Sequence, residues 1–214
     1  MHTIMVVDDS AFIVDVFVTM LERGGYRTIS TYGGQECLDL LRTERPDLIL
    51  LDIMMEPMDG RETLERIKSN PETKDIPVMM LTAKQLDPDE AEEYAIYVED
   101  YVLKPITHRE LYDAIEYILN RRARIRQDVE AARAAGVDQQ VIDEYARISK
   151  SIEVNRRLVS ILGSNYNIED NRTRIGDELA RAIKSMNMNI SFQEDRLEEI
   201  RSQMKIPMSQ AETS

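Results

Sequence analysis

The stretch from Pro46 to Met55 constrains the fold of this chain more than any other. It reads Pro-Asp-Leu-Ile-Leu-Leu-Asp-Ile-Met-Met, and Leu48 to Leu51 form an unbroken apolar run. Such a run is typical of a strand that is buried on both faces, at the centre of a parallel sheet. The run leads into Asp52, and open α/β sheets place their chemistry at the carboxyl ends of the strands. The sequence therefore predicts a central strand with an acid at the functional edge of a sheet.

Four more apolar runs alternate with amphipathic stretches in the first 120 residues. They predict strands at Ile4–Val7, Tyr26–Ser30, Ile76–Leu81 and Tyr101–Leu103. The first helix is expected to bury a stripe at helical spacing, formed by Phe12, Val16, Met20 and Leu21. Pro88-Asp89-Glu90 opens a short acidic helix, and Thr107 followed by Glu110 has capping-box spacing. Because right-handed crossovers connect such elements, the alternation predicts a doubly wound parallel sheet.

Charge and composition narrow the classes of function. The net charge of the 214 residues is −13, and the excess of acid lies almost entirely in the first 120 residues, which are not expected to bind nucleic acid through their overall field. Cys37 is the only cysteine and cannot form a disulfide within the chain. No secretory leader and no apolar run of about 18 residues is present. We therefore expect a cytoplasmic protein with no membrane segment.

Polar side chains follow four of the predicted strands: Asp8 and Asp9, Asp52, Thr82, and Lys104. In a parallel sheet these strand ends lie side by side, so the groups should converge on one crevice. Clustered carboxylates repel one another, and a hard divalent cation such as Mg²⁺ relieves that repulsion while leaving positions for phosphate. A hydroxyl and an ammonium group are suited to hold phosphoryl oxygens. The set predicts metal-assisted, in-line transfer of a phosphoryl group onto Asp52.

Residues 1–120 resemble the receiver domain of two-component response regulators. The resemblance is carried by Val6-Val7-Asp8-Asp9-Ser10, Pro46 to Asp52, Met58-Asp59-Gly60, Leu81-Thr82-Ala83 and Tyr101-Val102-Leu103-Lys104-Pro105, in family order and spacing. It implies the flavodoxin-like strand order 2-1-3-4-5, for which a chemotaxis member of this family is a standard example.

The resemblance also implies a role for each site residue. Asp52 resembles the phosphoacceptor, which receives the group from a sensor histidine kinase. Asp9, Asp52 and the backbone oxygen of Met54 resemble the direct ligands of Mg²⁺, and Asp8 resembles an acid that acts through water. No independent catalytic domain is implied. An enzyme of the haloacid dehalogenase type is rejected, because it needs an Asp-x-Asp after the first strand and Asp8 and Asp9 are adjacent.

Three further residues complete the expected site. Thr82 resembles the switch hydroxyl, Tyr101 the aromatic switch that turns inward when Thr82 moves, and Lys104 the phosphate-binding lysine. The bond from Lys104 to Pro105 is expected to be cis. The chain departs from the commonest family pattern after Asp52, where Glu56 precedes Pro57.

Residues beyond 120 have a helical pattern in which apolar residues recur at steps of four and three. Gly136-Val137-Asp138 should end one helix and cap the next, and Gly163 to Asn167 should form a turn. Three stripes are expected. They comprise Leu111, Ile115, Ile118, Ile125, Val129 and Ala132; then Val141, Tyr145, Ile148, Ile152, Asn155, Val159 and Leu162; then Ile175, Leu179, Ala182, Met186, Ile190, Gln193, Leu197, Ile200 and Met204.

Narrow stripes on long helices need partner helices. We predict an all-α helical hairpin, three-helix unit or coiled-coil-like region that pairs with itself or with another chain, most simply as a symmetric homodimer. A compact monomeric bundle is the alternative. The expected organisation is a receiver domain at 1–120, a helical output or dimerisation region at 121–206, and a disordered tail at 207–214.

Two functions remain open for the helical region. It could signal through dimerisation or contact with another protein, as the output of a response regulator whose last receiver helix is continuous with it. It could instead bind DNA in an atypical way, through a basic cluster of Arg121, Arg122, Arg124 and Arg126; we favour the first, because no compact helix-turn-helix with a basic recognition helix is evident. Residues 121–214 contain no histidine, which excludes a phosphohistidine transfer domain.

Overall fold

The structure, a computed structural model, describes residues 1–82, 94–165 and 174–204. The chain divides into two compact units, Met1–Glu116 and Tyr117–Ser214. This division and the one that the sequence predicts, after residue 120, both lie inside helix α5, His108–Ala134. The two units are described in turn.

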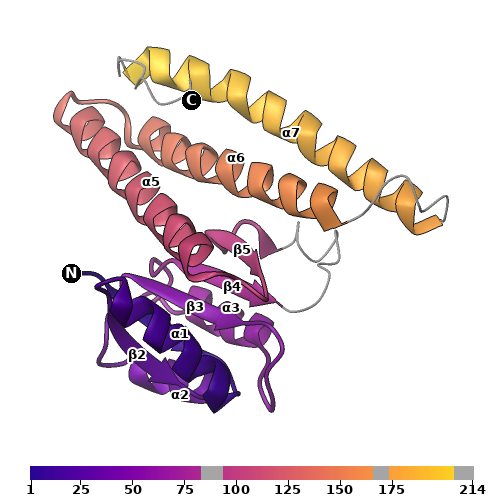
Figure 1. Ribbon diagram of the computed structural model, residues 1–214. Helices are drawn as coiled ribbons and strands as arrows, with labels where there is room; N and C mark the ends of the chain where they lie inside the picture. Colours follow the sequence, from indigo (N-terminus) through magenta and orange to yellow (C-terminus); the bar gives the residue numbers. More distant parts are fainter. Residues whose placement is uncertain (83–93, 166–173, 205–214) are drawn as a thin grey trace. The chain divides into compact units, whose positions relative to one another are not determined.

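The first unit contains a five-stranded sheet in which every neighbouring pair of strands is parallel (Figure 1). Its strands run in the order β2-β1-β3-β4-β5, which confirms the flavodoxin-like class and the predicted strand order. Their bounds are β1 Thr3–Val7, β2 Arg27–Thr31, β3 Leu48–Asp52, β4 Val78–Thr82 and β5 Asp100–Leu103. Every residue of β3 and β4 is buried, as a strand in the middle of a covered sheet requires.

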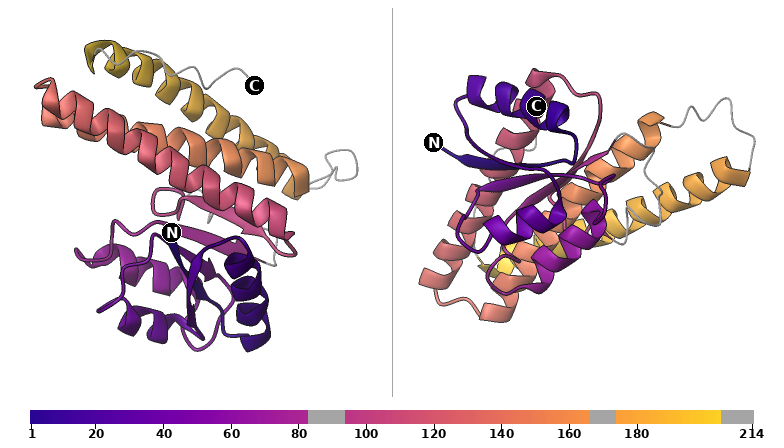
Figure 2. Two further views of the ribbon diagram at one scale, coloured as in Figure 1. Left: turned by 60° about the vertical axis from the view of Figure 1, so that its left-hand side comes forward. Right: turned by 90° about the horizontal axis from the view of Figure 1, so that it is seen from below.

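Helices cover both faces of this sheet. Their bounds are α1 Ala11–Arg23, α2 Gly34–Leu40 and α3 Gly60–Ser69. Helices α2 and α3 pack against each other on one face, and α1 lies on the opposite face (Figure 2). The first turns of α5 lie beside α1, where the Tyr112 hydroxyl donates to the carbonyl of Met20. The capping box that starts α5 is confirmed: Glu110 accepts from Thr107 N–H at 2.9 Å, and Glu110 N–H donates to Thr107 Oγ1 at 3.3 Å.

The buried face of α1 differs from the predicted one. Val14, Phe17 and Leu21 are buried, whereas Phe12, which the predicted stripe contained, is 73% exposed. Asp15, Thr19 and Glu22 recur at steps of four and three and mark one polar face of the helix, and Phe12 lies on that face, which the predicted stripe did not take into account. The sheet surface decides which stripe is covered.

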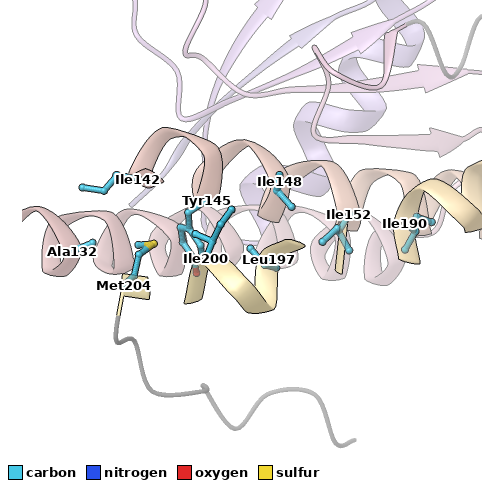
Figure 3. Packing of buried hydrophobic residues seen from close by; sticks show 9 residues of the cluster. All are labelled: Ala132, Ile142, Tyr145, Ile148, Ile152, Ile190, Leu197, Ile200 and Met204. Carbon is cyan, nitrogen blue, oxygen red and sulfur yellow. The ribbon is translucent and has the colours of Figure 1, made fainter. Parts of the chain in front are cut away.

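The second unit contains the rest of α5, helix α6 Gln139–Asn165 and helix α7 Arg174–Met204. Helices α6 and α7 pack along each other as an antiparallel hairpin (Figures 1 and 2). One buried cluster joins the three helices, with Ala132 from α5, a set from α6 and a set from α7 (Figure 3). Its members are Ala132, Ile142, Tyr145, Ile148, Ile152, Ile190, Leu197, Ile200 and Met204.

Polar contacts tie the same three helices at the surface. Arg196 of α7 donates two hydrogen bonds to the Glu144 carboxylate of α6, both at 2.9 Å. Arg156 of α6 pairs with Glu194 of α7 at 2.5 Å. Tyr117 of α5 donates a hydrogen bond to Glu153 of α6. Each helix of this unit is therefore fixed by contacts inside the chain.

The stripe on α7 is confirmed where the side chains are described, because Leu179, Met186, Ile190, Leu197, Ile200 and Met204 are buried. On α6, Tyr145, Ile148, Ile152, Asn155 and Leu162 are buried as expected. However, α6 also buries Ile142, Val154 and Leu158, which the predicted stripe lacked, so its covered face is wider than the spacing suggested. The stripes of α6 and α7 pack against each other inside one chain. They therefore give no reason to expect that a second chain covers them.

One predicted turn was wrong and others fall outside the described residues. Gly136 has a positive φ of 77° and Asp138 accepts from Gln140 N–H, as predicted for a break and a cap. Gly163 lies inside α6, where a helix tolerates glycine, and not in a turn. The predicted acidic helix at Pro88 and the predicted tail lie outside the described residues. In the described part of the chain, no helix is both long and apolar enough to cross a membrane.

Candidate functional site

The site is built where four parallel strands end. Asp52 is the last residue of β3, Thr82 is the last residue of β4, Asp8 directly follows β1 and Lys104 directly follows β5. The register places Asp52 beside Leu81 and Thr82 beside Leu103, so the four ends stand at one level of the sheet. The backbone N–H of Lys104 donates to the Thr82 carbonyl at 2.7 Å, which fixes the neighbouring ends of β4 and β5 to each other.

The Lys104 ammonium group joins the two acids of the central strands. Its Nζ lies 2.6 Å from Asp8 Oδ2 and 2.7 Å from Asp52 Oδ1. Both carboxylates are buried, with side chains 3% and 6% exposed, and the lysine side chain is 16% exposed. Charge-assisted hydrogen bonds of this length in a poorly solvated place are strong. The structure thus brings together three of the residues that the sequence singled out.

The ionised side chains of this trio, Asp8, Asp52 and Lys104, together carry a net charge of −1. The pKa values of Asp52 and Lys104 are shifted by their surroundings. Burial raises the pKa of Asp52 above its ordinary value; the hydrogen bond that Lys104 donates opposes the shift without cancelling it, and the charge of Asp8 adds to it. Burial alone lowers the pKa of Lys104, but its bonds to Asp52 and Asp8 outweigh burial and hold that pKa above its ordinary value. The cluster therefore attracts additional positive charge.

The other acid of the first strand end faces the loop after β3. Asp9 Oδ2 accepts a hydrogen bond from the backbone N–H of Glu56 at 3.1 Å. In the same loop, Met54 is 57% exposed and its backbone N–H donates to the Asp52 carboxylate. The Glu56–Pro57 bond is cis, which the sequence did not predict, and the Lys104–Pro105 bond is cis as predicted. Asp9 and Met54 therefore border the trio without joining its ion pairs.

The two residues expected to act as a switch are both buried. Thr82 is 2% exposed and Tyr101 is 3% exposed. Tyr101 belongs to β5, two residues before the last residue of that strand, while Thr82 ends the neighbouring strand β4. The Tyr101 ring therefore lies inward.

Gly60 supports the site in a way that the sequence analysis missed. Its N–H donates to the Ile53 carbonyl at 3.0 Å, and a Cβ at this position would lie 2.0 Å from the backbone oxygen of Asp52. Only glycine therefore lets α3 begin so close to the end of β3. Asp59 caps this helix by accepting from Glu62 N–H at 2.8 Å. The signal in the sequence was a glycine directly after a capping acid, where a close backbone approach could have been predicted.

The donor groups suit a hard cation in their chemistry. Among the described residues, no three Asp, Glu, His or Cys side chains are grouped as ligands of one metal ion. Lys104 contacts both Asp8 and Asp52. The groups at this edge are carboxylate and carbonyl oxygens, the ligands that Mg²⁺ prefers. Their surplus negative charge is the second feature that fits such an ion. The residues therefore fit magnesium in type and in charge.

Comparisons with known proteins divide the chain in the same two parts. Residues 4–116 match the family described as Response regulator receiver domain. Residues 121–208 match a family described as Metanogen output domain 2. The two matches leave only short segments between and beyond them.

Curated relatives and solved structures match the first part of the chain. The alkaline phosphatase synthesis transcriptional regulatory protein PhoP of Bacillus subtilis is 37% identical over 118 residues, which are 55% of this chain and 48% of that protein. The chain spans about half the length of the curated relatives it matches.

Among solved structures, the N-terminal domain of a response regulator receiver protein from Methanoculleus marisnigri JR1 is 68% identical, covering 56% of this chain and 97% of that chain, with a TM-score of 0.48. A CheY-like receiver domain protein from Methanospirillum hungatei JF-1 is 25% identical over 58% of this chain and 98% of that chain, with a TM-score of 0.53. The second comparison supports the strand order found here.

Proposed function

This chain belongs to the response regulator receiver domain family, and from that premise we propose that it is controlled by phosphorylation of Asp52. A sensor histidine kinase is the proposed donor, since kinases of this class phosphorylate receiver domains. The observation that carries the proposal is the buried contact of Lys104 Nζ with Asp52 at 2.7 Å, at an edge where the parallel strands end. The chain has the role of a signalling protein, and we assign it no separate catalytic domain.

The proposed transfer uses the groups in simple roles. A carboxylate oxygen of Asp52 attacks the phosphorus of the phosphohistidine, the P–N bond breaks, and its electron pair leaves with the imidazole. Lys104 holds an oxygen of the incoming phosphoryl group, and the Thr82 hydroxyl donates a hydrogen bond to another. Asp9, Asp52 and the Met54 carbonyl would hold Mg²⁺, with Asp8 acting through water. When bound, the ion would offset the negative charge that gathers during the transfer.

The proposed output follows from helix α5. It runs from His108 to Ala134 without a break, and the division between the units falls inside it. We propose that a movement of Thr82 and Tyr101 on phosphorylation reaches the helical unit through this shared helix. We propose that this unit, which matches an output domain family, acts by dimerisation or by contact with another protein.

The DNA-binding alternative has less support. Of the basic cluster expected from the sequence, Arg121 is buried and stacks over the Tyr117 ring at 5.6 Å, where it cannot reach a phosphate backbone. Arg156 pairs with Glu153 and Glu194. The curated relatives named as transcriptional regulators match this chain only along its first part.

Labelling by a small phosphodonor tests the proposal. Full-length protein is incubated with acetyl phosphate and Mg²⁺, and the intact mass is measured. We expect one added phosphoryl group, lost on treatment with hydroxylamine, and no addition to the Asp52→Asn variant. Asp15→Asn, an exposed acid on α1, is the matched control and should label normally. Absence of labelling in the unaltered protein, or equal labelling of Asp52→Asn, contradicts the proposal.

A further inference from the structure

Helix α7 carries a second stripe on the side away from its buried one. Ile190 is buried, while Met188 and Phe192, on either side of it, are 66% and 74% exposed. At about 100° per residue, these two side chains point away from Ile190. They continue in both directions at steps of three and four through exposed residues. We call the set the outer stripe; it comprises Arg181, Ser185, Met188, Phe192, Asp195 and Glu199.

The outer stripe has the spacing of a helix that faces another helix. No Asp, Glu, Lys or Arg occurs from Ser185 to Gln193, so the middle of the stripe is uncharged. Charged side chains stand at its ends, with Arg181 and the neighbouring Lys184 before the middle and Asp195 and Glu199 after it. A solvent-facing surface of a helix usually carries mixed charges along its length. Among the members of the outer stripe the charges are instead sorted by sign, with Arg181 before the middle and Asp195 and Glu199 after it.

This arrangement is complementary to itself when two copies are antiparallel. A two-fold axis at Ile190 sets Met188 of one helix opposite Phe192 of the other. The same axis sets Ser185 opposite Asp195 and Arg181 opposite Glu199, so opposite charges meet at both ends. Glu199 already accepts from Arg196 of its own chain at 2.8 Å, but its side chain is still 65% exposed and can accept a second partner. In a parallel pair, like charges would lie side by side instead.

We propose that the outer stripe is the surface through which two copies of this chain associate, with their α7 helices antiparallel. The proposal deepens the output role proposed above by naming the partner as a second copy, and it uses a face other than the stripes first expected to pair. The contact is isologous, with Met188 and Phe192 as its centre and charge pairs at its rim. The opposite face of α7 stays occupied by α6.

Charge-reversal variants of the full chain test this pairing. The first variant carries Arg181→Glu and Lys184→Glu, and the second carries Asp195→Lys and Glu199→Lys. All the altered positions are exposed, so circular dichroism should show unchanged helix content. Solution mass is measured by sedimentation for the unaltered protein, each variant, and an equimolar mixture of the two. We expect the unaltered protein to be a dimer and each variant alone to be a monomer. The equimolar mixture of the two variants should form a dimer again.

The outcomes separate the alternatives. An unaltered protein that stays monomeric at all concentrations overturns the proposal, and so do variants that dimerise as well as the unaltered protein, which is what parallel pairing predicts. Phe192→Ser should weaken self-association by about tenfold or more, as loss of a central contact does. Labelling of each variant by acetyl phosphate is measured in parallel. If both variants label but the pairing results fail, only the α7 inference falls, whereas failure of labelling bears on the role of Asp52.

Discussion

The receiver unit and the helical unit differ in where their polar groups lie. In the receiver, polar groups gather where buried strands end, and Lys104 joins Asp8 and Asp52 in a place that water hardly reaches. In the helical unit, the ion pairs lie along the surface, as between Arg196 and Glu144, whose side chains are 38% and 27% exposed. The first arrangement concentrates charge in one buried place, and the second distributes it.

This difference shows what each kind of pattern can specify. A chemical site needs particular side chains at particular strand ends, so its residues can be recognised one by one. A helical stripe needs only apolar side chains at regular helical spacing. It indicates that one face of the helix is buried but does not identify the partner that buries it. The stripe on α7 illustrates this, because it packs against α6 of its own chain. Four substitutions, each with a control, test this difference between the units.

Ile200→Ala should destabilise the helical unit by about 3 kcal/mol, because it leaves a cavity in the buried cluster of α5, α6 and α7. Urea unfolding followed by circular dichroism gives the value. Ile96→Ala is the matched control in the receiver unit, since Ile96 is 66% exposed. That change should stay within about 0.5 kcal/mol. A small effect at Ile200 would mean that the α6–α7 hairpin is not the core of its unit.

Gly60→Ala should destabilise the receiver unit by about 2 kcal/mol, because the new methyl group would lie 2.0 Å from the Asp52 carbonyl oxygen. The same urea experiment measures it. Gly163→Ala in α6 is the matched control, since a Cβ there meets nothing within 4 Å. Alanine should stabilise that helix by about 0.5–1 kcal/mol. Equal effects at the two glycines would show that α3 does not begin tightly against β3.

Asp52→Asn should stabilise the metal-free protein at pH 7, because burial raises the pKa of this carboxyl in the folded protein. The folded protein then binds the proton more readily than the unfolded chain, so its stability falls as the pH rises between the unfolded pKa of about 3.9 and the raised folded value. The advantage of asparagine should be complete above that window and vanish below it. Thermal unfolding in EDTA across this pH range measures the difference in stability between Asp52→Asn and the unaltered protein, with Asp15→Asn as the control. A difference that does not change with pH would contradict the prediction.

Tyr117→Phe should cost about 0.5 kcal/mol, because it removes the hydrogen bond to Glu153 at a partly exposed position. Burial, and then this bond, raises the pKa of the Tyr117 phenol to about 12. Tyr97→Phe is the control, since Tyr97 is an exposed tyrosine of the receiver unit. Urea unfolding gives both costs, and an ultraviolet titration of Tyr117→Phe should lose a tyrosine step near pH 12. If Tyr117→Phe keeps that step, the contact between α5 and α6 is not formed in solution.

The receiver sheet could be predicted because its strands are short apolar runs that end in polar groups. The strand bounds shifted by a residue or two, since hydrogen bonds between neighbours, and not composition, decide where a strand ends. The buried face of α1 was predicted wrongly at Phe12, because nine of its thirteen residues are apolar and the predicted stripe did not use Asp15 and Thr19, which mark the exposed face. The contact of Gly60 with Asp52 was missed, although a glycine directly after the capping acid Asp59 was a signal for it in the sequence.

The sequence singled out residues at the strand ends but not the contacts among them. The sequence placed Asp8, Asp52 and Lys104 at one edge, yet it gave no reason to expect the ammonium group between the two acids. In the helical unit, Arg121 was counted among surface cations although it is buried beside Tyr117. An arginine one turn after a tyrosine can lie on either side of a helix interface. Pattern alone does not distinguish the two.

The uninterrupted course of α5 affects how the two units can be prepared separately. The helix contains no glycine or proline between His108 and Ala134, so no natural stopping point lies near the division of the chain. A protease or an engineered cut there would leave a ragged end with unsatisfied carbonyl groups on one fragment and unsatisfied amides on the other. The helix of either fragment would then fray at the cut end. The melting temperature of the fragment would underestimate the stability that the same residues have in the intact chain.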